Sequence, residues 1–305
     1  MQQNSTESEY STKDSWIILS DIERSIKSKV EAIGTPLSEW DININYGIKT
    51  GFNDAFIISS EKRAEILDSC GSPEERERTD AIIRPILRGR DIHRYGTEWA
   101  NLWIISTFPA LHYNIENYPS LKAYLLSIGM EKLEQTGKEH IINGQKIKSR
   151  KKTNNKWFET QDSISYWDDL SKPKIIWGEI SDKSKFFLDE EGCYYPEATT
   201  FLMTGSHLYL LLAFLNCKLS EYLFSKIGTT TGVGTVRWKK FKIEKLPVPR
   251  TLPKIAEERI ISLSQKASSL RSDGLDSSET EHLIDCEIYS VFELTQEEID
   301  YIENR

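Results

Sequence analysis

The sequence predicts a chain that mixes α-helices with short β-strands and ends in an acidic helical tail. Apolar residues recur at helical spacing from Leu19 to Ile33 and again from Leu208 to Leu223. Short apolar runs bounded by turn residues, such as residues 172–181, are typical of strands. Helical spacing returns after residue 253, where Asp and Glu outnumber Lys and Arg. At 305 residues the chain is long enough for one large or two ordinary domains.

The helical patterns carry start and stop signals. Gly34 ends the first helix, Pro119 suits the first position of another, and Ser206 is expected to cap the helix with the widest apolar stripe. Thr295 and Glu298 form a capping box before a final short helix. We expect helices over residues 19–33, 61–69, 119–128, 207–223, 255–270, 279–291 and 296–303, and a charged loop over residues 72–80.

Strand signals fill the regions between these helices. Asn143-Gly144 is the strongest short hairpin signal, because a type I′ turn needs two residues that tolerate positive φ. Residues 41–59 predict two short strands around a turn at residues 49–53. Further strands are expected within residues 82–96, 101–106, 172–181, 185–189 and 199–205.

Composition restricts the class of protein. The four cysteines, which lie far apart with no C-x-x-C pair, suit a reducing cytosol. The first residues lack the apolar core of a signal peptide, and the longest apolar run, residues 208–215, is too short to span a bilayer. We therefore expect a cytoplasmic protein with a disordered tail over residues 1–14, a main domain over residues 15–250, and a helical docking tail over residues 251–305 that follows a boundary at Pro253.

The net charge of −8 hides two basic segments. Residues 1–45 carry 4 basic and 8 acidic residues, and residues 251–305 carry 5 and 13, so residues 46–250 carry 30 and 26, a net +4. Residues 138–156 and residues 226–250 each hold seven basic residues and one acidic residue. Because salt screens charge beyond about 10 Å, such local patches matter more than the average. A solvated lysine-rich loop is the alternative interpretation of either segment.

The first basic segment includes the predicted hairpin. Its cations would lie on an exposed two-stranded ribbon and the loop after it, and a ribbon of this kind can enter a DNA major groove. Trp157 and Phe158 can stack on a base, although aromatic residues beside a basic loop are more often its hydrophobic anchor. The expected phosphate contacts are Lys146, Lys148, Arg150, Lys151 and Lys152.

The second basic segment begins with small residues. Residues 228–235 contain three glycines among threonines and a valine, so the backbone there can lie close against an anion. Basic residues follow directly, and we expect the loop and these residues to approach a DNA groove. The predicted contacts are Thr229, Thr230, Thr231, Gly232, Gly234, Arg237, Lys239 and Lys240, together with Arg88 and Arg90 from an arginine-rich stretch. Asp80 and Asp91 are close enough in sequence to neutralise some of these arginines.

Signatures of catalysis are missing from the sequence. The five histidines have no metal-ligand spacing, and no P-loop, G-x-G-x-x-G or G-x-S-x-G motif occurs. Neither a carboxylate followed two residues later by lysine, as in many nucleases, nor the Pro-Pro-aromatic loop of DNA amino-methyltransferases is present. We therefore expect no catalytic residue, metal site or cofactor in this chain, while leaving open whether it acts as an enzyme.

Several segments occur in the order of a known family. YGIKTGFNDAF, ILRGRDIHRY, KTNNKWFETQD with KPKIIWGEIS, LLAFLNCKLSEY and RWKKFKIEKLPVP resemble the TaqI-like C-terminal specificity domain of Eco57I-like type IIG restriction-modification proteins. The resemblance covers roughly residues 40–250, and residues 279–303 resemble the helical tail that often follows. Cys217 is a departure, since serine is more common there.

The resemblance implies an α+β target-recognition domain, a mixed twisted sheet with packed helices, that grips duplex DNA. In that family a nuclease and an S-adenosylmethionine-dependent adenine methyltransferase precede this region, so S-adenosylmethionine and Mg²⁺ are expected only on a catalytic domain or partner subunit. The resemblance also implies that Gly47, Lys49, Thr50 and Asn53, with Gly89 and Asp91, define the fold.

Sequence-specific recognition of duplex DNA is the leading hypothesis. One alternative is a methyltransferase or nuclease fragment that is active by itself, for which binding of S-adenosylmethionine is the discriminating observation. Another is a protein-interaction module whose acidic C-terminal helices dock a catalytic subunit, with DNA contact only in the assembly.

Overall fold

A computed structural model describes residues 19–304 except residues 143 and 228–235. Its centre is a four-stranded antiparallel sheet in the order β12-β10-β14-β2. The register places Trp177 opposite Phe201, and Phe201 opposite Tyr46. These strands are β2 (Ile42–Tyr46), β10 (Lys174–Gly178), β12 (Phe186–Asp189) and β14 (Thr200–Gly205).

A second four-stranded sheet lies beside the first, in the order β13-β4-β7-β3. Its strands pair antiparallel except β13 with β4, which are parallel. Buried residues of both sheets, among them Ile86, Ile104 and Leu202, form one cluster, so the two sheets are packed together. The strands are β3 (Ile57–Ser59), β4 (Ile83–Leu87), β7 (Leu102–Ile105) and β13 (Tyr195–Pro196).

Four two-stranded ribbons complete the strands of the described residues. Two connect distant parts of the chain: β1 (Thr35–Pro36) pairs with β16 (Pro247–Val248), and β11 (Ile180–Ser181) pairs with β15 (Val236–Arg237). The other two are local hairpins: β5 (Ile92–His93) with β6 (Gly96–Thr97), and β8 (Glu139–Ile142) with β9 (Gln145–Lys148).

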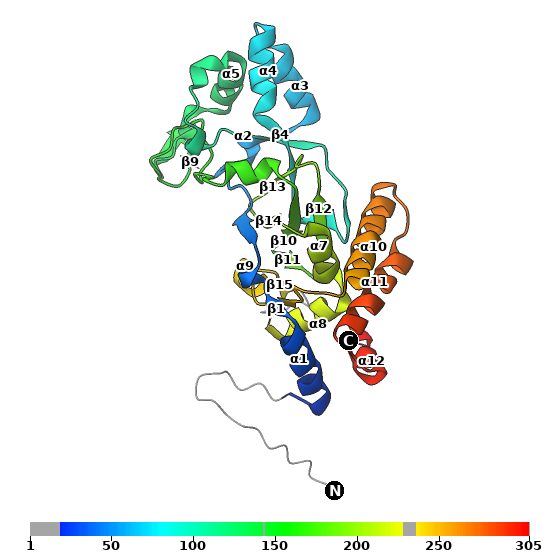
Figure 1. The fold of residues 1–305 in the computed structure, drawn as a ribbon. Coiled ribbons are helices and arrows are strands. Elements are labelled where there is room, and N and C mark those ends of the chain that lie inside the picture. The colour runs from blue at the N-terminus through cyan, green and yellow to red at the C-terminus, as the bar shows by residue number, and fades with distance from the viewer. Residues whose placement is uncertain (1–18, 143, 228–235, 305) are drawn as a thin grey trace.

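The helices fall into groups that Figure 1 separates clearly. Near the second sheet lie α2 (Asn53–Phe56), α3 (Ser60–Asp68), α4 (Pro73–Ala81), α5 (Pro119–Ile128) and α6 (Met130–Leu133). Near the central sheet lie α1 (Asp21–Ile33), α7 (Leu208–Asn216), α8 (Lys218–Ile227) and α9 (Lys240–Ile243). The tail consists of α10 (Lys254–Ser272), α11 (Ser278–Val291) and α12 (Gln296–Glu303).

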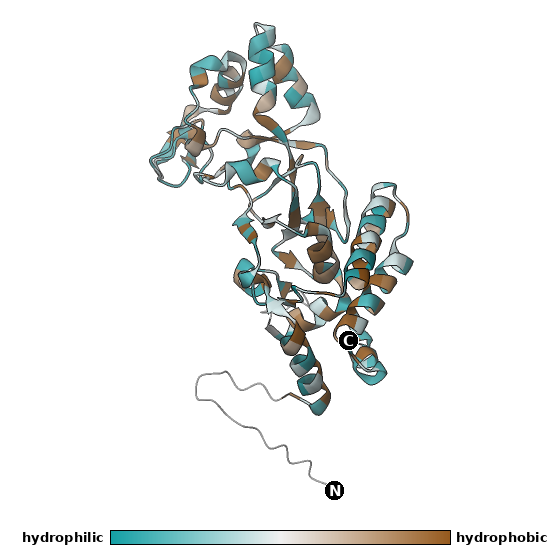
Figure 2. Ribbon diagram, viewed as in Figure 1, coloured by the Kyte–Doolittle hydropathy of each residue, from teal (hydrophilic) through white to brown (hydrophobic). Residues whose placement is uncertain are grey.

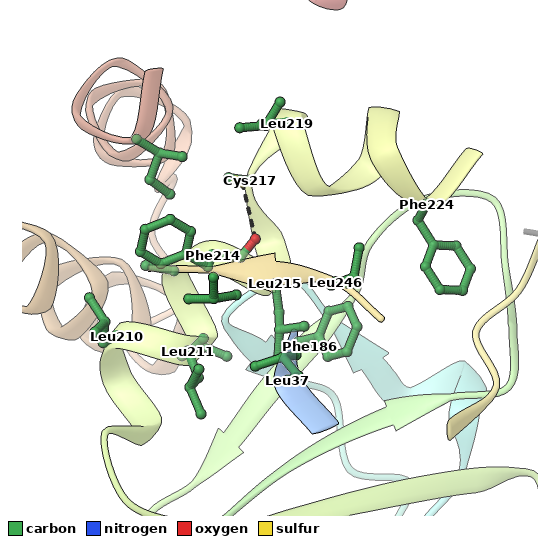
Figure 3. Close-up of a cluster of buried hydrophobic side chains, with 14 of the residues drawn as sticks. Leu37, Phe186, Leu210, Leu211, Phe214, Leu215, Cys217, Leu219, Phe224 and Leu246 are labelled. Carbon is green, nitrogen blue, oxygen red and sulfur yellow. Dashed lines mark hydrogen bonds between the residues drawn. The ribbon is translucent and has the colours of Figure 1, made fainter. Parts of the chain in front are cut away.

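The largest core lies where α7 and α8 cover the central sheet (Figure 3). Nearly every residue of α7 is buried, which explains why this helix is almost uniformly apolar in Figure 2. The tail belongs to the same core, because Ile260, Ile284 and Phe292 are fully or almost fully buried in it. The helices after Pro253 therefore pack as part of the main body.

Most predicted elements are present, and the mixed α+β fold is confirmed. The helices that begin near Asp21 and Pro119 occur, as does the hairpin of β8 and β9, in which Gly144 has φ +79°. The capping box at Thr295 is also formed. Among the described residues, no helix is long and apolar enough to cross a membrane.

Two local predictions are wrong. Residues 72–80, expected as a charged loop, form most of α4, because Ser72 caps it and Pro73 occupies its first turn. The expected single helix after Ser206 is two helices that break at Cys217, and the cap position of α7 is His207 with φ +56°. The two strands expected around residues 49–53 are present as β2 and β3, of which β2 joins the central sheet and β3 joins the second.

Candidate nucleic-acid interface

The β8–β9 hairpin presents cations on one strand. In β9, Lys146 and Lys148 are exposed while Ile147 between them is partly buried, as expected for side chains that alternate across a ribbon. Gly137 N donates to Arg150 O (2.9 Å) and Ser149 N donates to Lys138 O (2.9 Å), which extend the pairing beyond the strands. The two arms of the hairpin are thereby held together down to its base.

A pocket of about 650 Å³ lies along this hairpin, and we call it the hairpin pocket. Two glycines, Gly51 and Gly137, leave room at its wall. Five lysines line it, and none of them forms an ion pair with any residue that the structure describes. Its lining is Gly51, Phe52, Lys132, Gly137, Lys146, Ile147, Lys148, Ser149, Arg150, Lys151 and Lys152. Unpaired lysines around a hollow create a positive potential suited to phosphate.

Lys132 was not among the predicted contacts. It comes from α6, fourteen residues before Lys146, in a stretch of mixed charge that the count over residues 138–156 excludes. Only the fold brings α6 against β9. The weak signal available in the sequence was a lysine three residues after Gly129, within the short helix that begins at Met130.

Arg150 was predicted to contact a phosphate, and this prediction is corrected because its side chain is buried. Its side chain is buried and donates to the backbone oxygens of Leu133 (2.8 Å), Thr50 (3.0 Å), Glu159 (2.7 Å) and Trp157 (2.5 Å). The guanidinium also lies 4.9 Å from the ring centre of Phe56. Burial lowers the pKa of Arg150 to about 10, which still leaves it charged near neutral pH. Arg150 therefore holds the loop together beneath the lysines.

The neighbouring aromatic residues act mainly as the anchor. Phe158 is buried in a core cluster with residues of α3 and α5. Trp157 packs against it edge to face, with 5.5 Å between the ring centres. Phe158 is thus unavailable for stacking on a base. The common interpretation of aromatic residues beside a basic loop applies here.

The second basic segment has fewer free cations than its charge count suggests. Arg237 pairs with Glu179 at 2.8 Å, and Lys240 donates to the backbone oxygen of Ile44 (2.8 Å) and lies 3.7 Å from Glu244. Lys239 is partly buried and forms no ion pair with a described residue. The predicted loop contacts Thr229, Thr230, Thr231, Gly232 and Gly234 lie outside the described residues.

The arginine-rich stretch is mostly structural. Arg88 donates to both carboxylate oxygens of Asp91 at 2.8 Å, so its prediction as a DNA contact is corrected: the carboxylate that the sequence placed nearby neutralises it. Arg90 is exposed and has no ion pair with a described residue. Arg94 donates to Ser184 Oγ (2.9 Å) and pairs with Glu221 and Glu281, which ties it to α8 and α11.

At two of the fold-defining positions that the resemblance implied, Gly47 and Gly89, the backbone of another segment comes close to the glycine. A Cβ on Gly47 would lie 1.9 Å from the backbone oxygen of Glu197, and one on Gly89 would lie 3.3 Å from the Cα of Gly178. Thr50 donates from Oγ1 to Asn53 Oδ1 (2.6 Å), which closes the turn beside the hairpin pocket. Larger side chains at these glycines would separate the strands.

The β8–β9 hairpin lies on the side of the molecule away from the acidic tail. In Figure 1, β9 and α9 lie on the side away from α10, α11 and α12, while β15 lies nearer the middle of the molecule, beside β1. The basic hairpin and the acidic tail, which are separate in the sequence, are therefore also separate in space. No group of three or more His, Cys, Asp or Glu side chains that could hold a metal ion occurs among the residues described.

Comparison with known families now decides the membership of this chain. Residues 84–248, more than half of the chain, match the TaqI-like C-terminal specificity domain. The chain belongs to this family. The match includes the segment that leads to β16 and most of the lining of the hairpin pocket, of which Gly51 and Phe52 precede the matched residues.

Solved structures share the fold of this TaqI-like domain. One is described as the type IIG restriction endonuclease BpuSI, with a TM-score of 0.50 and 13% sequence identity, covering 88% of this chain and 33% of that chain. Another is the type IIL restriction-modification enzyme MmeI in complex with DNA, with a TM-score of 0.58 and 12% identity, covering 88% and 36%. The chain thus spans about a third of the length of these proteins.

Proposed function

We propose that this chain is the DNA target-recognition module of a restriction-modification system. The observation that carries the proposal is the hairpin pocket, where five lysines that form no ion pair with a described residue surround a hollow on a member of a specificity-domain family. Phosphate oxygens would replace the missing partners, because lysine is a compact cation that can reach successive phosphates of a duplex. Lys146, Lys148, Lys151 and Lys152 are the proposed phosphate contacts, with Lys132 added from the structure.

The proposal extends to the catalytic partner. The module would direct an S-adenosylmethionine-dependent adenine methyltransferase and endonuclease held on another domain or subunit, which would also carry S-adenosylmethionine and Mg²⁺. The length of the solved relatives supports this, since two thirds of each lies outside the match. If the chain itself were the methyltransferase, titration with S-adenosylmethionine in a calorimeter would give heat of binding, and we expect none.

The decisive experiment measures DNA affinity against salt. Replacing both Lys151 and Lys152 by alanine should reduce the slope of log K against log salt by about 1.8, since each lost phosphate contact removes about 0.9. The effect should be similar for duplexes of any sequence. The matched control replaces Lys254 and Lys266 by alanine, because these exposed lysines lie on α10 on the opposite flank and their loss changes the net charge equally. An unchanged slope in the first variant, or an equal change in both, would contradict the proposal.

The helical tail is the proposed contact with the partner. Ile255 (81% exposed) and Leu275 (54% exposed) are apolar side chains on its surface. Deleting the tail is not a clean test, because Ile260, Ile284 and Phe292 belong to the main core. Replacing Ile255 and Leu275 by serine should instead weaken partner binding and leave the salt dependence of DNA binding unchanged.

A further inference from the structure

Arg237 differs from the lysines of the hairpin pocket because it has a carboxylate partner while remaining accessible. Its side chain is 43% exposed, that of Glu179 is 27% exposed, and Nη1 lies 2.8 Å from Glu179 Oε1. The other N–H groups of this guanidinium donate to no other described residue. The pair therefore presents free donors at the surface with little net charge.

Such a pair is poorly suited to phosphate and well suited to a base edge. A phosphate contact gains affinity from release of counterions, and Glu179 cancels most of that gain. A base edge instead requires donors in a fixed plane, because a guanidinium reads guanine through two parallel hydrogen bonds to O6 and N7. A carboxylate that holds one side of the guanidinium supplies this orientation.

The backbone on both sides of Arg237 is fixed. Arg237 pairs with Ile180 in the β11–β15 ribbon, and Trp238 N donates to Glu179 O at 2.7 Å. Trp238 is buried, stacks on Phe224 at 4.0 Å between ring centres, and accepts a hydrogen bond from Trp177 Nε1 through its backbone oxygen. Arg237 is thus pre-organised by the main core, which reduces the entropy lost when it binds.

An apolar side chain lies beside this position. Ile180, directly opposite Arg237 in the ribbon, is 54% exposed. An exposed aliphatic side chain can contact the thymine methyl group favourably but gains little from phosphate.

We infer that Arg237 reads a guanine of the target sequence in the major groove, with Glu179 as its positioning residue and Ile180 as an adjacent apolar contact. The inference rests on the proposed function and deepens it. Under this inference the hairpin pocket binds phosphates of any sequence, and the β11–β15 ribbon discriminates between bases.

The test selects duplexes from a random pool with the full chain at low salt and sequences those retained. The wild-type protein should enrich a motif with an invariant G·C pair. In Arg237→Lys, which keeps the charge but not the planar donor pair, discrimination at that pair should fall by about 5- to 150-fold. The salt slope should change by much less than 0.9. Arg259→Lys is the matched control, since Arg259 forms a similar pair with Glu287 (2.8 Å) in the tail.

Glu179→Gln separates positioning from a merely structural role. Removing the carboxylate frees the guanidinium, so discrimination at the same pair should fall while the salt slope becomes steeper, by up to about 0.9. A structural role predicts only a lower thermal unfolding midpoint, which is measured for every variant.

Other outcomes overturn the inference while leaving the proposed function intact. If Arg237→Lys keeps the motif unchanged, or if Arg237→Ala weakens all duplexes equally and flattens the slope by about 0.9, Arg237 is not a base reader. If the wild-type chain retains no duplex of any sequence at low salt, the proposed function fails and this inference fails with it.

Discussion

At the scale of single residues, Arg150 has a role in the fold that its place in a basic segment does not predict. It stands among five lysines within eleven residues, yet it alone of these cations turns inward. The reason is geometric, because a planar guanidinium can satisfy several backbone oxygens at once and an ammonium group cannot do so in the same plane. The buried arginine closes the loop, and its charged neighbours are left at the surface.

Replacing Arg150 by methionine should destabilise the protein by about 3 kcal/mol, because the buried backbone oxygens of Leu133, Thr50, Glu159 and Trp157 lose their donor. Unfolding in urea measures this free energy. Lys151→Met is the control: its exposed side chain should change stability by less than about 0.5 kcal/mol but should flatten the salt slope of DNA binding. Equal stability of the two variants would refute the structural role of Arg150.

A second residue-scale prediction concerns the ion pair of Lys174 and Asp189. These residues are opposite each other in β10 and β12, are almost completely buried, and lie 2.6 Å apart, and Asp189 also accepts from the backbone of Cys193 and Tyr194. Burial lowers the pKa of Lys174, and Asp189 opposes that shift. Asp189→Asn should therefore cost about 3–5 kcal/mol by leaving a buried ammonium unpaired.

The exposed lysine two positions earlier provides the comparison. Lys172 pairs with Asp168 and Asp169 at the surface, so Lys172→Met should cost less than about 1 kcal/mol in the same urea unfolding assay. Similar losses in the two variants would show that burial of the Lys174–Asp189 pair carries no special cost.

At the scale of elements, the break between α7 and α8 shows the effect of one cap. Cys217 has extended backbone angles, its thiol donates to Phe214 O (3.0 Å), and it accepts from Ser220 N (3.3 Å). The bond from Ser220 satisfies a donor in the first turn of α8, as a capping side chain does. The apolar stripe predicts one long helix because both helices bury the same face, and periodicity alone does not reveal a change in helix direction.

Substitution at Cys217 tests the capping role. Cys217→Ser should preserve or improve stability, because serine is a stronger capping residue, whereas Cys217→Ala should lose about 1 kcal/mol. Thermal unfolding of the two variants distinguishes these outcomes. If serine is no better than alanine, the sulfur serves only to fill the buried site. Burial also raises the pKa of Cys217 to about 12, so this thiol should not react with alkylating reagents in the folded protein at neutral pH.

At the scale of the whole molecule, the two ends of the described chain hold each other. Glu298 in α12 accepts from Ser25 Oγ (2.6 Å) and pairs with Lys29 Nζ (2.7 Å), both in α1, and Glu23 in α1 pairs with Lys226 in α8. Burial opposes ionisation of Glu298, but the hydrogen bonds from Lys29, Ser25 and the Thr295 amide together lower its pKa to about 2. These contacts fix both helices against the core.

Because of this arrangement, the free energy of unfolding depends on pH. A carboxylate whose pKa is lower in the folded state stabilises above its unfolded pKa of about 4.3, and this stabilisation disappears as the pH falls toward 2. Glu298→Gln should therefore be less stable than wild type by about 2 kcal/mol at pH 7, with a difference that shrinks below pH 4. Urea unfolding at several pH values measures it. Glu297→Gln, at an exposed neighbouring position, should show no such trend.

The sequence alone determined the elements whose signals are local. A turn that tolerates positive φ defines the β8–β9 hairpin, a capping box starts α12, and charge counts along the chain located both basic segments. It also carried the family resemblance, because the order of motifs is preserved along the chain. These features depend on neighbours within a few residues, so the printed sequence contains them.

Only the tertiary structure decided which cations are free. Arg150, Arg88 and Arg237 look equivalent to Lys151 in the sequence, yet they meet backbone oxygens or carboxylates, and Glu179 lies 58 residues before Arg237. Likewise Lys132 joins the hairpin pocket only because α6 packs beside β9, and the tail joins the main core only through contacts with distant helices. Burial and pairing arise from long-range packing, which no local pattern encodes.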